Sequence, residues 1–292
     1  MTGFLLLATI LLAWWLQSVW ALLLGMLVPP LLMTLLSHLL IPGPKARIAF
    51  DRDALGRLVR FGKWVLLSTI AAYFLNQSDR IILGKFVDLE TLALYQIGFL
   101  FAMLPRGVGW SLNQRVVFPL FSRRPPWESE DNRIKINRSR RLLTGLILLG
   151  RGTMSVIGDD LVRLLYDPRY HQAGAYTVLI SLAAMPQVIT FGYDNLALAA
   201  GDSRRYAIYR IGLAILTGTL TFFGVMTWGV LGVILALPAS YLLSYPALLW
   251  TIRPYRGWDG LHDAGYALLA ILIAVAAVWY NADAIAALAA SS

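Results

Sequence analysis

The sequence contains no cysteine, and charged residues make up only 14% of its 292 positions. Without cysteine the chain has no disulfide framework, no thiolate metal ligand and no thiol nucleophile. Soluble domains carry roughly 25% charged residues, so this composition excludes an ordinary soluble domain. Apolar residues are abundant instead: 58% of the chain is hydrophobic, with 10 Trp and 13 Tyr. Aromatic residues in such numbers are typical of the interfacial belts of a membrane protein.

Apolar stretches recur along the chain, and most of them approach the roughly 20 residues that a helix needs to cross a bilayer. They cover residues 3–16, 19–40, 64–83, 92–118, 142–157, 173–200, 208–227, 229–251 and 264–280. We therefore expect an all-α fold, a polytopic transmembrane helix bundle of about 8 or 9 spans. The first stretch lacks the basic start and the cleavage site of a signal peptide, so we interpret it as a clipped membrane helix.

The lysines and arginines are distributed unevenly over the loops between these stretches. Eighteen of the 25 lie in 41–63, in 122–141 and in two short loops with Arg204, Arg205, Arg210, Arg253 and Arg256. The alternate loops hold only Lys85, Arg163 and Arg169. The positive-inside rule makes the basic loops cytoplasmic, which predicts a multi-pass protein of the bacterial inner membrane. The net charge of +9 then follows from topology, so we expect the lipid bilayer as a partner and no nucleic acid.

Charged side chains inside the apolar stretches are expensive, at about 2.5 to 3.5 kcal/mol each at the bilayer centre. They are Asp79, Arg80, Arg106, Arg115, Arg151 and Asp194. Such residues usually face the interior of a bundle, where they line a transport path or form ion pairs. An arginine-rich lining suits an anionic phosphate group, because a guanidinium can bind phosphate through two hydrogen bonds.

Arg151, Arg106 and Arg80 are the candidate cationic residues of such a path. Arg151 follows Arg141 by about ten residues, or roughly 15 Å at 1.5 Å per residue, which is too deep for easy snorkelling. Its alternative role is a structural ion pair. Arg106 and Arg115 lie nine residues apart, on opposite faces of a straight helix. We therefore expect Arg106 to line the path and Arg115 to snorkel or to pair.

Asp79 and Arg80 are adjacent, and adjacent helical positions diverge by about 100°, so the two are poorly placed to pair with each other. Each should meet a partner on another helix or in a cavity. Asn76 lies one turn before Asp79 and can share its face. The role of Asp79 is either a structural bond or, within a cavity, gating or ion coupling. Further along, Gln187 is a path candidate, and Asp194 is an ion-pair partner or a coupling carboxylate.

The sequence carries no signature of an enzyme. Its 3 histidines are scattered without zinc-site spacing, and no glycine-rich phosphate-binding loop is present. We therefore expect no catalytic activity, no metal site and no cofactor, with coupling to a proton or sodium gradient left open.

An ordered set of motifs occupies residues 19 to 121. It comprises Phe61–Gly62 at the start of a helix, Asp79 followed by Leu83–Gly84–Lys85, Tyr95 on the next helix and Pro119 near its cytoplasmic end. This set resembles the polysaccharide flippases of the multidrug/oligosaccharidyl-lipid/polysaccharide superfamily, the O-antigen and exopolysaccharide (Wzx-type) transporters. The later segments "LVRLLYDPRYHQAGAYTVLISLAAM" and "LALAAGDSRR" are similar to the second half of such a protein.

The resemblance implies a flippase that moves polyprenyl-diphosphate-linked oligosaccharide across the inner membrane for lipopolysaccharide or exopolysaccharide biosynthesis. Lipid-linked oligosaccharide is then the cargo, and other polysaccharide-assembly proteins are candidate partners. The implied domains are the end of a first lobe with a basic connector (1–63), a second six-helix lobe (64–252) and a trailing helix (253–292).

Because members of this superfamily have two lobes, we expect the sequence to be N-terminally truncated. A misplaced start and a half transporter that pairs with another chain are the alternatives. Three other functions compete with the flippase: a membrane polymerase or ligase acting on lipid-linked sugars, an ion-coupled multidrug exporter of the same superfamily, and a non-transporting scaffold. Arginines inside the spans favour an anionic cargo over a cationic drug.

Overall fold

The computed structural model describes residues 19–40, 51–193 and 195–291. Contacts between residues divide the chain into two compact units, Met1–Leu55 and Gly56–Ser292. Every regular element in the described residues is helical, which confirms the predicted all-α class. The predicted helix 3–16 lies outside the described residues, and the predicted domains 1–63, 64–252 and 253–292 stay predictions.

The first unit contains helix α2 (Val19–Leu40), whose bounds coincide with the predicted stretch. Its described apolar segment is Leu27–Ser37. Leu27, Leu31 and Leu35 are each about 60% exposed within it. A helix with this much apolar surface is suited to lipid or to a partner helix rather than to water.

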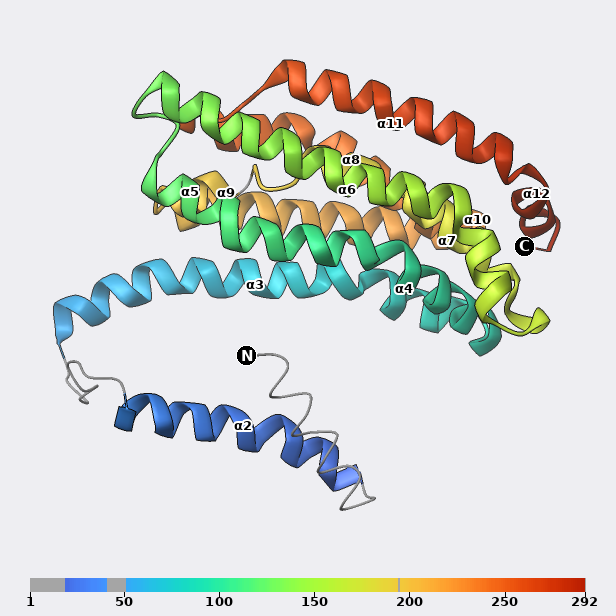
Figure 1. The fold of residues 1–292 in the computed structure, drawn as a ribbon, viewed down its shortest axis with the longest axis horizontal. Helices are drawn as coiled ribbons and strands as arrows, with labels where there is room; N and C mark the ends of the chain where they lie inside the picture. The colour runs from blue at the N-terminus through green and yellow to red at the C-terminus, as the bar shows by residue number, and fades with distance from the viewer. Residues whose placement is uncertain (1–18, 41–50, 194, 292) are drawn as a thin grey trace. The chain divides into compact units, whose positions relative to one another are not determined.

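The second unit is a bundle of long helices (Figure 1). Its elements are α3 (Arg52–Phe86) from Gly56 onward, α4 (Leu89–Leu112), a π-helical segment η1 (Asn113–Val117), α5 (Phe118–Arg123), α6 (Glu130–Leu165), the 3₁₀ turn η2 (Pro168–Tyr170), α7 (Gln172–Ala183), α8 (Met185–Ile189), α9 (Asn195–Ala199), α10 (Ser203–Ile252), the 3₁₀ turn η3 (Arg253–Tyr255), α11 (Gly260–Tyr280) and α12 (Ala282–Ser291).

Six of the described helical segments are long and apolar enough to cross a membrane. They are Arg52–Phe86, Leu89–Arg123, Glu130–Leu165, Pro168–Ile189, Ser203–Tyr255 and Gly260–Tyr280. In the apolar 18-residue stretch of α3, only 11% of the residues are buried. In that of Pro168–Ile189, 72% are buried. The centre of the bundle is therefore the α7 region, while α3 turns most of its apolar surface outward, as a lipid-facing helix does.

Helix α10 contains a break that divides it into two helices. Trp228 and Gly229 have non-helical backbone angles, and Gly229 has a φ of 57° with a ψ of −135°, a conformation that glycine adopts at little cost. Gly224 and Gly232 pack backbone to backbone across the break, since a Cβ built on Gly224 would lie 2.5 Å from the Gly232 carbonyl oxygen. The separate predicted stretches 208–227 and 229–251 are thereby confirmed.

The predicted continuous span 173–200 was wrong in its extent. The membrane-crossing segment ends at Ile189, and a turn at 190–193 separates it from the short helix α9. Gly192 has a φ of 83° in this turn, which ends the helical path. Apolar composition alone does not distinguish such a turn from a helix, so hydropathy predicted one span where the chain folds back into the bundle.

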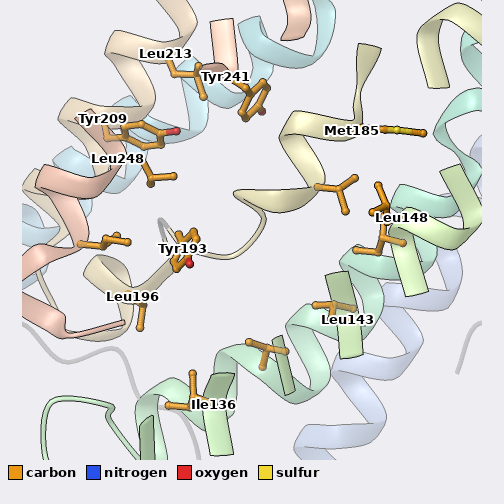
Figure 2. Packing of buried hydrophobic residues seen from close by; sticks show 14 of the residues in the cluster. Ile136, Leu143, Leu148, Met185, Tyr193, Leu196, Tyr209, Leu213, Tyr241 and Leu248 are labelled. Carbon is orange, nitrogen blue, oxygen red and sulfur yellow. The ribbon is translucent and has the colours of Figure 1, made fainter. Parts of the chain in front are cut away.

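The core packs α4, α6 and α7 against one another, with α11 on the other side of α6 (Figure 1). One buried cluster joins α6 to the turn after α8 and to both halves of α10 (Figure 2). Its side chains include Ile136, Leu143, Leu148, Met185, Tyr193, Leu196, Leu213 and Leu248. This packing brings the polar positions of α8, α9 and α10 towards α3 and α4, where the candidate site lies.

Candidate substrate path

A cavity of about 530 Å³ lies among α3, α4, α8, the 190–193 turn, α9 and α10. Its polar lining residues are Asn76, Gln77, Arg80, Arg106, Gln187, Thr190, Asn195, Tyr206, Tyr209, Arg210 and Tyr241. Three of them are arginines, and none of the described lining residues is acidic. The volume falls within the roughly 300–1,000 Å³ of small-molecule sites. The cavity is therefore cationic and rich in hydrogen-bonding groups inside an otherwise apolar bundle.

Four of the predicted path residues meet at this cavity: Asn76, Arg80, Arg106 and Gln187. Arg106 Nη1 donates a hydrogen bond of 2.9 Å to Asn76 Oδ1, which links α4 to α3. Gln187 Nε2 donates to Tyr241 Oη over 2.7 Å, which links α8 to the second half of α10. Polar side chains that line the cavity thus also hold its walls together.

Asp79 lines a smaller pocket of about 50 Å³, which shares Asn76, Arg106 and Gln187 with the larger cavity. Tyr95 Oη on α4 donates to Asp79 Oδ2 over 2.7 Å, while the guanidinium of Arg80 lies 4.6 Å from the ring centre of Phe99, also on α4. Asp79 and Arg80 therefore each meet α4 rather than each other, as their spacing predicts. Among the described residues, Asp79 Oδ1 and Arg80 Nε are buried without a hydrogen-bond partner.

The structure does not bring Arg151 to the lining of the cavity. Its side chain is fully buried, and Nη1 donates to the Ala102 carbonyl oxygen over 2.8 Å. Ala102 lies less than one turn before Pro105. Helices α4 and α6 approach closely at this level, since a Cβ built on Gly150 would lie 2.8 Å from the Cβ of Pro105. No carboxylate of the described chain pairs with Arg151. It joins α6 to the backbone of α4 next to Arg106, and a direct role in the path stays a prediction.

Two further predicted residues remain, of which the structure describes one. Arg115 is an exposed residue of the π-helical segment η1 and is absent from the cavity lining. Asp194 lies outside the described residues, so its role as an ion-pair or coupling residue stays a prediction. Its neighbour Asn195 is buried and lines the cavity.

Sequence reasoning missed Arg210 as a lining residue. The prediction that placed it in a cytoplasmic loop was wrong, because α10 begins at Ser203, capped by the Asp202 carboxylate, which accepts from the Arg205 N–H over 3.0 Å. Arg210 is therefore two turns into the helix. Tyr206 lies four residues before it and shares its face, and both line the cavity. The capping aspartate followed by this i, i+4 pair was the signal available in the sequence.

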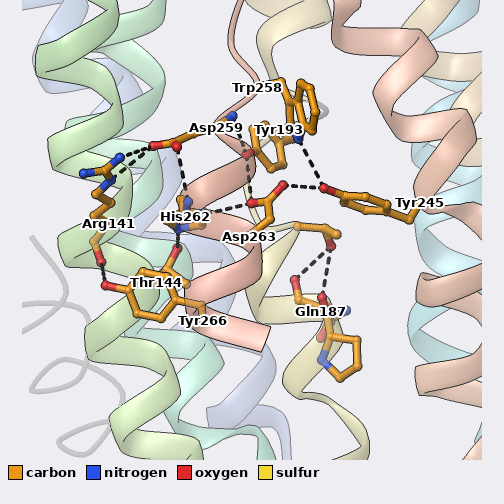
Figure 3. A network of polar contacts seen from close by, with 12 residues as sticks. Arg141, Thr144, Gln187, Tyr193, Tyr245, Trp258, Asp259, His262, Asp263 and Tyr266 are labelled. Carbon is orange, nitrogen blue, oxygen red and sulfur yellow. Dashed lines mark hydrogen bonds and ion pairs between the residues drawn. The ribbon is translucent and has the colours of Figure 1, made fainter. Parts of the chain in front are cut away.

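A second polar network joins α6, α10 and α11 to the turn before α9 (Figure 3). Asp263 Oδ1 accepts from Tyr193 Oη over 2.9 Å and lies 2.7 Å from His262 Nδ1. Its Oδ2 accepts from Tyr245 Oη over 2.5 Å. His262 Nε2 lies 3.0 Å from Thr144 Oγ1. This buried network ties the C-terminal helix α11 to the bundle, although the sequence showed only scattered histidines.

Two groups of this network lie outside the membrane-crossing segments. Burial raises the pKa of Tyr193 to about 12, and the guanidinium of Arg140 stacks 3.4 Å from the centre of its ring. At Asp259 burial acts to raise the pKa, but hydrogen bonds from Arg141 and from the His262 N–H, with the charge of Arg141, bring it below the ordinary value. Asp259 is thus ionised, and it pairs with Arg141 Nη2 over 2.7 Å.

Together these features define a multi-pass α-helical membrane protein with a polar, cationic cavity between its helices. A family model described as "Polysaccharide biosynthesis protein" matches residues 1–174, which is more than half of the chain. The chain belongs to this family, so the resemblance seen in its motifs is confirmed, and its role lies in polysaccharide biosynthesis. Comparison with curated proteins gave no match, and comparison with solved structures gave none either.

Proposed function

We propose that this protein is a flippase that moves polyprenyl-diphosphate-linked oligosaccharide across the inner membrane for cell-surface polysaccharide biosynthesis. The observation that carries the proposal is the cavity lined by Arg80, Arg106 and Arg210. Placing three arginines among membrane-crossing helices costs several kcal/mol unless they meet an anion or water. A transported anionic headgroup would offset this free-energy cost by pairing with the arginines.

The cavity has the chemistry that such a headgroup needs. Arginine binds phosphate oxygens through two parallel hydrogen bonds, so two or three arginines can hold a diphosphate. Asn76, Asn195 and the tyrosine hydroxyl groups at the wall can hydrogen-bond sugar hydroxyls. The hydrocarbon tail stays in the bilayer, so only the polar part of the cargo enters the protein.

The lining also distinguishes the flippase from the two main alternatives. A multidrug exporter that accepts cationic compounds requires carboxylates in its cavity, whereas the described lining residues are cationic or neutral. Asp79, in the adjoining pocket, is the candidate for coupling to a proton or sodium gradient. A polymerase or ligase would need activated nucleophiles or acid–base groups, and the arginines of the cavity cannot act as either.

The test measures which leaflet holds the lipid-linked oligosaccharide, using a probe that cannot cross the membrane. Deletion of the native gene should leave the cargo in the cytoplasmic leaflet, and the wild-type protein should restore it to the outer leaflet. A variant with Arg80→Gln, Arg106→Gln and Arg210→Gln should restore less than one tenth of that amount. Arg115→Gln is the matched control, since Arg115 is a span arginine outside the cavity lining, and it should rescue fully.

Two results would overturn the proposal. Accumulation of cargo in the outer leaflet of the deletion strain would mean that flipping still occurs and that a later enzymatic step is missing. Full rescue by the triple variant, at wild-type protein levels, would mean that the cavity arginines do not handle the cargo.

A further inference from the structure

A second basic site lies apart from the cavity, between the first turns of α3 in the second unit and the start of α10. It is a pocket of about 460 Å³ lined by Arg57, Arg60, Phe61, Lys63, Trp64, Gly201, Asp202, Ser203 and Arg204. None of these residues lines the candidate substrate path. The pocket therefore needs an explanation of its own.

The pocket has a strong excess of positive charge. Arg57, Arg60, Lys63 and Arg204 form no ion pair with any residue that the structure describes. The one carboxylate in the lining, Asp202, is already engaged: it caps α10, accepts from Tyr255 Oη over 3.0 Å and lies 3.5 Å from Arg205 Nε. Four clustered cations repel one another, so the arrangement favours an anion that bridges them.

The position of Trp64 indicates the level of the pocket in the membrane. Lys63 Nζ lies 5.6 Å and Arg204 Cζ lies 5.8 Å from the centre of its ring. Directly after it along α3, Leu66 is 61% exposed and Leu67 is 42% exposed. Tryptophan is enriched where the headgroups of a bilayer meet its hydrocarbon. The cations therefore lie at headgroup level.

An apolar groove continues from this pocket along the same two helices. It has a volume of about 470 Å³. Its walls include Leu67, Ile70, Phe74 and Ile81 of α3 and Ile211 and Ile215 of α10. The two helices run in the same direction here, so groove residues follow pocket residues on both. A phosphate at the cations would leave its hydrocarbon chain aligned with the groove.

We propose that this pocket and groove together bind one anionic phospholipid, with its phosphate among Arg57, Arg60, Lys63 and Arg204 and an acyl chain along α3 and α10. The charge of the pocket selects an anionic headgroup over a zwitterionic one, and the groove selects a lipid over a soluble phosphate. The bilayer supplies such a lipid at all times. The inference does not depend on transport of a lipid-linked sugar.

The test uses the purified full chain in detergent, with phosphatidylglycerol as the anionic probe and phosphatidylcholine as the zwitterionic one. Native mass spectrometry should show phosphatidylglycerol retained in preference to phosphatidylcholine. Combined replacement of the four cations by glutamine should lower retained phosphatidylglycerol at least about tenfold. The control replaces Arg123, Arg124, Arg138 and Arg253, which are equally exposed, and should change retention less than twofold.

A second pair of variants tests the groove. Gly218 lines it, and a Cβ built there meets no atom within 4 Å, so Gly218→Leu directs a side chain into open space in the groove. Gly212 on the same helix is equally open but does not line the groove. Gly218→Leu should reduce retained phosphatidylglycerol several-fold, while Gly212→Leu should leave it unchanged. Because both residues are open, loss of folding would affect both variants alike, and a thermal unfolding curve detects it.

Three outcomes would overturn the inference. Equal loss of phosphatidylglycerol from the four-cation variant and from its control would indicate diffuse attraction to a basic surface. Displacement of the lipid by glycerol phosphate at an equal concentration would indicate a site for soluble phosphate. Displacement by an equimolar amount of a polyprenyl phosphate would assign the site to the transported lipid instead of a resident phospholipid.

Discussion

Asp79 accepts a hydrogen bond of 2.7 Å from Tyr95, and Arg80 lies against the ring of Phe99. Arg151 donates to a backbone carbonyl, and Arg106 donates to an amide oxygen. At the scale of the residue, then, these four charges within the membrane-crossing helices are held by neutral groups. A buried charge held in this way keeps its charge available for a ligand, whereas a closed ion pair would cancel it.

The bond between Tyr95 and Asp79 can be tested by removing one oxygen atom. Tyr95→Phe should lower the free energy of unfolding by about 1–3 kcal/mol, because it takes away the hydrogen-bond donor of a largely buried carboxylate. Thermal unfolding in detergent measures the change. Tyr73→Phe is the control, since Tyr73 lies on α3 with Asp79 and is 61% exposed; its effect should stay within about 0.5 kcal/mol. Equal stability of both variants would show that the bond contributes nothing.

The ion pair between Arg141 and Asp259 should make stability depend on pH. The pKa of Asp259 lies below its ordinary value of 3.8 in the folded protein, so its contribution is complete above the unfolded pKa and is lost as pH falls through the folded one. Since Arg141 is half exposed, we expect about 1 kcal/mol at neutral pH. Unfolding of Asp259→Asn, measured from pH 7 to pH 3, should show a deficit that is constant above pH 5 and shrinks below about pH 4. A deficit that stays unchanged at pH 3 would exclude the ion pair as its cause.

At the scale of the element, the close approach of Gly224 to Gly232 holds the two halves of α10 together. Gly232→Ala should destabilise the protein by about 1–3 kcal/mol, because the new methyl group would overlap the Gly224 carbonyl. Gly212→Ala, in open space on the same helix, should be neutral or slightly stabilising, since alanine favours a helix. Unfolding midpoints of the two variants give the comparison. A tolerated Gly232→Ala would mean that the halves are not packed this closely.

The elements also show what the sequence could predict. The separate stretches 208–227 and 229–251 follow from composition around Gly229, and α2 matches its predicted bounds. The turn at 190–193 could not be predicted from hydropathy, because it is short and apolar residues flank it on both sides, at 188–189 and at 196–199. Arg210 was missed for the opposite reason: the polar first turns of α10 resemble a loop until the Asp202 cap is considered. Hydropathy locates membrane segments, but helix ends depend on caps and backbone angles.

For the candidate site, the sequence identified Asn76, Arg80, Arg106 and Gln187, all of which line one cavity. A charged residue within an apolar helix is a strong signal of a functional or structural role, because burying the charge costs free energy that some interaction must offset. Arg151 carries the same signal but bonds to the Ala102 carbonyl next to Pro105. Helix rotation and packing decide whether a buried charged side chain faces a cavity or bonds to the backbone of another helix. Those are properties of contacts between elements, so one chain's hydropathy and spacing could not separate the two cases.

At the scale of the whole molecule, the basic loops gather at one end of the second unit. The starts of α3, α6 and α11 lie there with α5 and α9 (Figure 1). The last turn of α6, with Arg163, and the following turn, with Asp167 and Arg169, belong to the other end. The proposed lipid site and the part of the cavity that Arg210 lines both lie towards the basic end. The orientation of the bundle therefore decides which leaflet each of them faces.

This orientation can be measured directly, since the chain has no cysteine to interfere with labelling. Asp167→Cys and Glu128→Cys place single thiols at exposed positions of opposite ends. The positive-inside rule predicts that a membrane-impermeant maleimide labels Asp167→Cys in intact cells, and Glu128→Cys only after the membrane is opened. Labelling in the reverse order would place the basic loops outside. The basic pocket and the part of the cavity that Arg210 lines would then lie towards the outer leaflet, which would contradict a flippase that loads its cargo at the basic end from the cytoplasmic side.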